Sequence, residues 1–205
     1  MSHRQRYRSL LAALGILGVS LQIAKDGWGM LLYYTVLSNI LVFSFLIFIV
    51  LLESKRHTLN QDRLLRLKGG VTMAITITFV IYHFLLAPLV KPEDFWNIRN
   101  FLVHYIVPIG MILDTIILDK KNSYRIFDPF RWTIVPLFYS FFALFNGLVT
   151  KLPIPGATDS PFPYFFTNVS KYGWTSVLTN SLAIFIGYLL FGYGLLLLKK
   201  FIGKK

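Results

Sequence analysis

The sequence predicts an all-α polytopic membrane protein, a bundle of six transmembrane helices with both termini in the cytoplasm. Hydrophobic residues make up 55% of the 205 residues and charged residues only 15%, whereas soluble domains carry about 25% charged residues. Six long stretches contain no charged residue, and most of them reach the length of about 20 residues that a spanning helix needs. The short loops that remain leave no room for a separate soluble domain, so the sequence predicts one membrane domain over 1–205.

The predicted spans cover about 8–24, 30–52, 69–90, 100–118, 132–150 and 175–198. The first of these follows three arginines, as the apolar core of a secretory signal would. No convincing small-x-small cleavage site follows before Lys25, so we expect this segment to remain as a span.

Basic residues flank the spans unequally. The N-terminus, the C-terminal tail and the loops after the second and fourth spans carry sixteen of them: Arg4, Arg6, Arg8, Lys55, Arg56, Arg63, Arg66, Lys68, Lys120, Lys121, Arg125, Arg131, Lys199, Lys200, Lys204 and Lys205. The opposite loops carry Lys25, Lys91, Arg99, Lys151 and Lys171. The positive-inside rule therefore predicts an integral protein of the bacterial plasma membrane with cytoplasmic N- and C-termini. The expected partner of the net charge of +12 is the anionic inner leaflet, and not nucleic acid.

The lack of cysteine excludes disulfides, thiol nucleophiles and cysteine-ligated metal clusters. His83, His104 and Asp114 are residue types that bind metals, but they include no closely spaced ligand pair. We therefore expect neither a metal nor a cofactor.

With this topology, polar residues of five spans lie at one shallow depth on the outer side. The spacing of Thr35, Ser38 and Asn39 puts them on one face of the second span. The remaining members of this layer are His83, Asn100, His104, Asn146, Thr179 and Asn180. Because polar groups in the hydrocarbon region normally face the interior or water, the sequence predicts an outward-facing polar pocket lined by these residues.

Two prolines lie close to the two histidines of this layer. Pro108 cannot donate a hydrogen bond to the carbonyl of His104, and Pro88 likewise releases the carbonyl of Phe84. The sequence therefore predicts kinks at both histidines, which either open space for a ligand or only shape the bundle.

A hydroxyl beside an imidazole is the minimum for nucleophilic catalysis, because histidine takes up a proton near neutral pH. Thr35 or Ser38 with His104 or His83 would meet this requirement, although such hydroxyls often bond only to their own helix. Asn100, one turn before His104, or His83 could orient the imidazole. Amide donors for an oxyanion would be Asn39, Asn146 or Asn180.

Asp114 lies about 15 Å further along its helix than His104, so we expect it to be a hydrogen-bonded or protonated strut between helices.

Residues in several segments of the sequence resemble those of a known membrane protein family. The stretch from Tyr33 to Asn39, the residues Trp96, Asn100 and His104, and then Pro108 and Asp114 resemble a prokaryotic six-span membrane protein family. This family is distantly similar to the androgen-induced and androgen-dependent membrane proteins of animals, which are intramembrane hydrolases of fatty acid esters of hydroxy fatty acids. The resemblance implies Thr35 as the nucleophile and His104 as its base. The spacing from histidine to proline and acid, and the asparagine after the threonine, are shifted by about a residue from the animal pattern.

Two other functions remain open. The same residues could line the cavity of a non-catalytic protein that binds a lipid or small molecule. A transporter would need polar residues that continue to the inner face, where only Ser44, Thr72, Thr76, Asp114 and Thr115 are found. The proline and aromatic segment at 151–173 could be a lid over the pocket or an anchor at the membrane interface.

Overall fold

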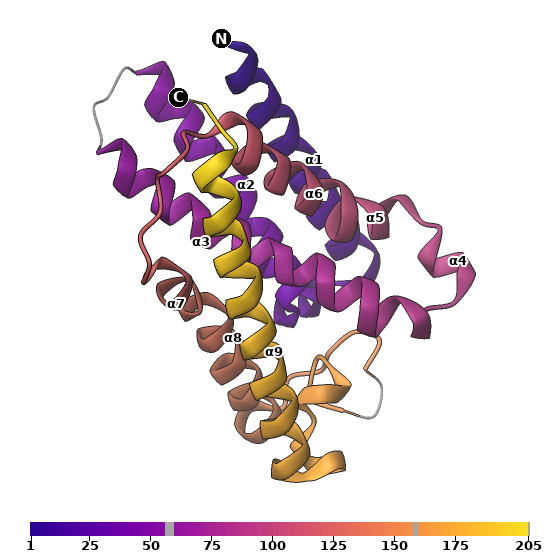
Figure 1. Cartoon of the computed structure of the whole chain (residues 1–205). Helices are drawn as coiled ribbons and strands as arrows, with labels where there is room; N and C mark the ends of the chain where they lie inside the picture. The colour runs from indigo at the N-terminus through magenta and orange to yellow at the C-terminus, as the bar shows by residue number, and fades with distance from the viewer. Residues whose placement is uncertain (56–59, 158–159, 205) are drawn as a thin grey trace.

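The computed structural model describes residues 1–55, 60–157 and 160–204, so that Arg56 and Lys205 lie outside the described residues. The described chain is all-helical and contains six helical segments long and apolar enough to cross a membrane, which confirms the predicted fold class. Both termini lie at the same end of the bundle (Figure 1), which we call the terminal end. The loop between the last two spans lies at the opposite end.

Several spans are built from more than one helical piece. The six spans are α1 (His3–Asp26); α2 (Tyr34–Ser54); α3 (Gln61–Ile81) with η2 (Tyr82–Leu86) and η3 (Ala87–Leu89); α5 (Ile98–Phe101) with η4 (Leu102–Ile106), α6 (Val107–Leu113) and η5 (Asp114–Leu118); α7 (Asp128–Trp132) with α8 (Ile134–Phe145) and η6 (Asn146–Thr150); and α9 (Val169–Phe201). Short turns outside the spans are η1 (Trp28–Leu32), α4 (Pro92–Phe95) and η7 (Phe165–Thr167).

Local sequence explains where the helices begin. Ser2 and Gln5 form a capping box at the start of α1, and the Asn168 side chain accepts a hydrogen bond from the backbone of Lys171 at the start of α9; both contacts satisfy N–H groups that lack a helical acceptor. The second span begins at Tyr34, later than predicted, because Gly27 turns the chain with φ of +83° into the 3-10 turn η1. Thr35 is therefore the second residue of α2.

The predicted distortions at the two histidines take the form of π-helical turns. His83 lies in η2 and His104 lies in η4, each followed within a few residues by its proline. In η4 the N–H of Val107 donates to the carbonyl of Leu102, five residues earlier. Since Pro108 has no N–H, the carbonyl of Val103 is left for a partner from another helix, as π-helical turns at functional sites often provide.

A buried ionic cluster joins four spans near the terminal end. Arg8 of α1 contacts Asp114 at 3.0 Å and Asp119 at 2.8 Å. Lys68 of α3 contacts both carboxylates as well, and Lys199 of α9 donates at 2.8 Å to the backbone carbonyl of Asp119. All five side chains are buried. Asp114 is therefore an interhelical strut, but one that is paired with two cations. Arg8, Lys68 and Lys199, which were expected at the lipid surface, face the protein interior.

The described parts of the loop after the fifth span, 151–157 and 160–168, are held against the end of that span. Asn146 donates to the carbonyl of Pro161 at 2.9 Å, and its own carbonyl accepts from the backbone of Leu152 at 3.2 Å. Phe162 is fully buried and lies directly against Gly147. The segment is thus packed on the bundle by specific contacts.

Replacing Gly147 by alanine is expected to lower the free energy of unfolding by about 1–3 kcal/mol, because the added methyl group overlaps the ring of Phe162. Thermal unfolding in detergent measures this effect. Gly187→Ala is the matched control, since nothing lies within 4 Å of a Cβ at that helical glycine. Equal stability of the two variants would contradict the packing of this loop.

Candidate active site

Thr35 and His104 meet where the second and fourth spans cross. Thr35 Oγ1 lies 3.3 Å from His104 Nε2. The Thr35 side chain comes from the first turn of α2 and the imidazole from the π-helical turn η4. Thr35 is only 8% exposed and His104 is half-buried. The structure therefore places the hydroxyl and the imidazole within reach of a direct proton transfer.

The contacts of the other ring nitrogen assign the tautomer of His104. Nδ1 lies 2.7 Å from Asn100 Oδ1 and 3.2 Å from the Asn100 carbonyl oxygen. The Asn100 amide is itself oriented, because its Nδ2 donates to the carbonyl of Phe95 at 2.9 Å. Both neighbours of Nδ1 are acceptors, so Nδ1 carries the proton and Nε2 presents a lone pair to Thr35.

An aromatic ring fixes the plane of the imidazole. Tyr82 of η2 stacks on His104 with ring centroids 3.6 Å apart and an interplanar angle of 15°. Tyr82 is buried, so it also excludes solvent from one face of the imidazole. The imidazole is thus held in one orientation by Asn100 and Tyr82 together.

Asn39 and Ser38 contact the backbone of Thr35 from the next turn of α2. Asn39 Nδ2 donates to the carbonyl of Thr35 at 2.8 Å and to the carbonyl of Val103 at 2.9 Å. The second of these is the carbonyl that the π-helical turn and Pro108 release. Ser38 Oγ bonds to the Thr35 carbonyl at 3.0 Å and lies 2.7 Å from Thr78 Oγ1. Both side chains therefore join α2 to its neighbours, and both amide protons of Asn39 are already in use.

The structure does not bring the remaining predicted pocket residues to Thr35 and His104. His83 is exposed, and its Nδ1 lies 3.2 Å from Tyr105 Oη. Asn146 binds the backbone of the loop after it. Asn180 is half-buried on α9, and no hydrogen bond joins it to the other predicted site residues within the described chain. The residues gathered around the hydroxyl and the imidazole are thus a smaller set than the sequence predicts.

Tyr164 is a neighbour of Thr35 that the site prediction did not include. Its Oη lies 3.4 Å from the backbone nitrogen of Thr35, which donates to it. Burial raises the pKa of the Tyr164 phenol above its ordinary value, while hydrogen bonds from Thr35 act in the opposite direction. The only sequence signal for this contact was the density of aromatic residues in the 151–173 segment.

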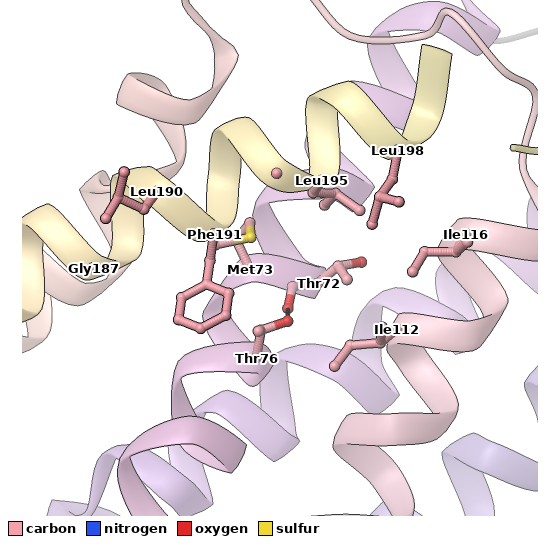
Figure 2. A pocket seen from close by; sticks show the side chains of 11 residues that line it. Thr72, Met73, Thr76, Ile112, Ile116, Gly187, Leu190, Phe191, Leu195 and Leu198 are labelled. Carbon is pink, nitrogen blue, oxygen red and sulfur yellow. Dashed lines mark hydrogen bonds between the residues drawn. The ribbon is translucent and has the colours of Figure 1, made fainter. Parts of the chain in front are cut away.

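Two adjoining apolar cavities open between α3 and α9. The larger has a volume of about 380 Å³ and reaches Ile112 and Ile116 of the fourth span, and the smaller has about 280 Å³. Figure 2 shows side chains from α3, α9 and the fourth span converging on the larger one. The cavities share Met73, Thr76, Gly187 and Phe191. We call this continuous feature the α3/α9 groove.

The threonine hydroxyl, the imidazole and the amide form a chain of three groups like that of a serine hydrolase triad. His104 Nε2 can take the proton of the Thr35 hydroxyl. The side-chain oxygen of Asn100, Oδ1, can then stabilise the imidazolium cation that results. The geometry therefore supports nucleophilic attack by Thr35 on an electrophile such as an ester carbonyl.

Comparisons of the chain with protein-family models, curated proteins and solved structures found no match.

Proposed function

We propose that this protein is an intramembrane hydrolase of lipid esters in which Thr35 is the nucleophile and His104 the general base. The observation that carries the proposal is the 3.3 Å contact between Thr35 Oγ1 and His104 Nε2, with Asn100 Oδ1 2.7 Å from the opposite nitrogen. A lipid substrate fits a site built from membrane-spanning helices. The ester class proposed, a fatty acid ester of a hydroxy fatty acid, is that of the animal hydrolases which the sequence resembles.

The proposed reaction has two stages. Thr35 Oγ1 attacks the ester carbonyl carbon while His104 Nε2 takes the hydroxyl proton. The tetrahedral intermediate then expels the alkoxide of the hydroxy fatty acid, which receives that proton from Nε2 and leaves as the alcohol. In the second stage water attacks the acyl-threonine with His104 again acting as base. Return of the proton to Thr35 Oγ1 releases the fatty acid and restores the free enzyme.

The proposal also assigns the protein a location and an orientation in the cell. We place the terminal end of the bundle in the cytoplasm of a bacterial plasma membrane, because sixteen of the 21 basic residues belong to the termini and the two loops that share this end. The catalytic residues then lie nearer to the outer side. Those surface cations not buried in the ionic cluster would contact anionic lipid headgroups.

A second candidate function, a non-catalytic lipid-binding protein, is favoured by the α3/α9 groove. The hydroxyls of Thr72 and Thr76 in its lining donate to backbone carbonyls of their own helix, at 2.9 and 2.7 Å. Gly187 and Gly194 leave open space along α9. The groove therefore offers an apolar surface suited to an acyl chain. Thr35 and His104 are not among the residues that line this groove in the described chain, so in this function a lipid would bind apart from them.

Labelling with a fluorophosphonate that carries a long alkyl chain tests the proposal. The detergent-purified protein is expected to form a covalent adduct on Thr35, because the electrophilic phosphorus traps an activated hydroxyl and the alkyl chain suits an intramembrane site. Peptide mass spectrometry locates the adduct. We expect no Thr35 adduct in Thr35→Ala and strongly slowed labelling in His104→Ala.

The controls separate the two candidate functions. Ser140→Ala removes an exposed hydroxyl of α8 that donates only to the carbonyl of Pro136, and it is expected to label like the unchanged protein. An adduct on Thr35 that requires His104 supports the hydrolase. Folded protein that forms no adduct contradicts the hydrolase and leaves lipid binding as the function.

A further inference from the structure

The proposed reaction creates a negative charge on the ester carbonyl oxygen, but the described structure places none of the three amides expected to stabilise it as a free donor beside Thr35 and His104. Both Nδ2 protons of Asn39 are donated to backbone carbonyls. Asn146 Nδ2 is used on the loop, donating to Pro161 and Leu152, and Asn180 has no hydrogen bond to the site within the described residues. Oxyanion stabilisation is often the largest single contribution to such catalysis, so another donor is required.

Tyr164 stands beside the point where that charge would develop. Its Oη is 3.4 Å from the backbone nitrogen of Thr35, which belongs to the first turn of α2 and so lacks an acceptor within the helix. The Tyr164 phenol also lies near the side chains of Thr35 and Tyr139, and Tyr139 Oη donates its own proton to the carbonyl of Leu32. In the described part of the chain no hydrogen bond from Tyr164 Oη to a backbone carbonyl or a carboxylate is found, so neither kind of acceptor holds its proton. An ester oxygen that displaces the hydrogen bond from the Thr35 N–H to Tyr164 Oη would receive both protons.

Packing holds the Tyr164 ring in this position. The ring stacks on Phe166 with an interplanar angle of 3° and meets Tyr33 edge-on at a centroid distance of 5.7 Å. Tyr33 in turn donates to the carbonyl of Pro155 at 2.6 Å, so it joins the start of α2 to the same loop. A preorganised donor is what oxyanion stabilisation needs, because no reorganisation cost arises during the reaction.

We propose that Tyr164 is a further catalytic residue, whose Oη donates a hydrogen bond to the oxyanion formed when Thr35 attacks the ester. The backbone N–H of Thr35 supplies the second hydrogen bond to the same oxygen. No proton is transferred in this role, since the phenol keeps its proton while the intermediate forms and collapses. The burial that raises the pKa of Tyr164 keeps the phenol in its protonated, donating form. This inference rests on the proposed hydrolase function.

Tyr164→Phe tests the inference, because it removes the hydroxyl and keeps the ring. We expect kcat for a fatty acid ester of a hydroxy fatty acid in mixed micelles to fall by about 10²–10³-fold, as after loss of one oxyanion donor. KM is expected to stay nearly unchanged, since the charge exists only in the transition state and intermediate. Mass spectrometry of the released hydroxy fatty acid measures both constants.

Tyr33→Phe is the matched control. It removes another phenol of the same aromatic contact, and that phenol holds the same loop through Pro155. If Tyr164 only ordered the loop, the two variants would lose activity together, and the inference would be overturned. Activity of Tyr164→Phe equal to that of the unchanged protein, with Thr35→Val inactive, would also overturn it while the hydrolase function stands. Absence of Thr35-dependent hydrolysis in the unchanged protein would instead contradict the proposed function itself.

Discussion

Hydrolysis of a fatty acid ester of a hydroxy fatty acid is expected to fall by at least about 10³-fold in Thr35→Val, because the variant keeps the shape of threonine but has no hydroxyl to attack the ester. The methyl group that replaces Oγ1 also leaves His104 Nε2 without the proton it would accept. Initial rates at saturating ester, followed by mass spectrometry of the released hydroxy fatty acid, measure the effect.

Thr78→Val is the matched control for this experiment. Thr78 is a buried threonine that contacts Ser38 Oγ at 2.7 Å, and Ser38 can still donate to the Thr35 carbonyl without it. We therefore expect Thr78→Val to retain most of the activity, and Thr35→Ser to retain a measurable part. A Thr35→Val variant that hydrolyses the ester as fast as Thr78→Val would refute Thr35 as the nucleophile.

The largest expected loss of stability follows from Arg8→Met. Arg8 is 2% exposed and contacts Asp114, Asp119 and Glu53. Removing one partner of a buried ion pair leaves an uncompensated charge in the interior, which costs about 3–5 kcal/mol. We expect a corresponding decrease in the temperature of thermal unfolding in detergent, with the loss concentrated in the contacts between α1 and the fourth span.

Two further variants test whether the loss of stability comes from the buried charge of Arg8 and not from replacing any arginine of this helix by methionine. Arg6→Met changes an exposed arginine of the same helix and is expected to leave the unfolding temperature nearly unchanged. Arg8→Met combined with Asp114→Leu removes a charge of each sign, while Lys68 keeps its pair with Asp119. We therefore expect the double variant to be more stable than the sum of the two single losses predicts. An unfolding temperature of Arg8→Met equal to that of Arg6→Met would be inconsistent with this cluster.

The ionic cluster and the proposed catalytic residues occupy different layers of the bundle. Arg8 and Lys68 lie in the parts of α1 and α3 nearest the terminal end, whereas Thr35 is at the far end of α2 and Tyr164 in the loop opposite the termini. The two sets of variants therefore probe independent properties. The Thr35 and Tyr164 variants are expected to change activity without large changes in stability.

Local sequence was sufficient to predict the architecture of six membrane-spanning helices. Membrane spans are predictable because every backbone polar group in the hydrocarbon region must be satisfied within the segment, so that apolar length alone specifies a helix. The i,i+4 spacing of Asn100 and His104 likewise made Asn100 one of two predicted partners of the imidazole, the other being His83, and the structure has the contact with Asn100. Prolines 88 and 108 predicted a distortion at each histidine, although not that both would be π-helical turns.

Depth in the membrane, by contrast, was not enough to identify neighbours. Depth placed His83, Asn146 and Asn180 in one layer with Thr35, but a shared depth leaves the direction of each side chain around the bundle undetermined. The packing of the helices turns His83 toward Tyr105 and uses Asn146 to hold the loop.

What the sequence by itself determined is the set of six spans and their helical nature, because these depend on residues within one segment. Only the tertiary structure decided which hydroxyl meets His104, which cations pair with Asp114 and that Tyr164 lies against Thr35. Those contacts join residues 69, 106 and 129 positions apart. Side chains so distant in sequence meet only through the rotation and crossing of whole helices, which close packing of the assembled bundle sets.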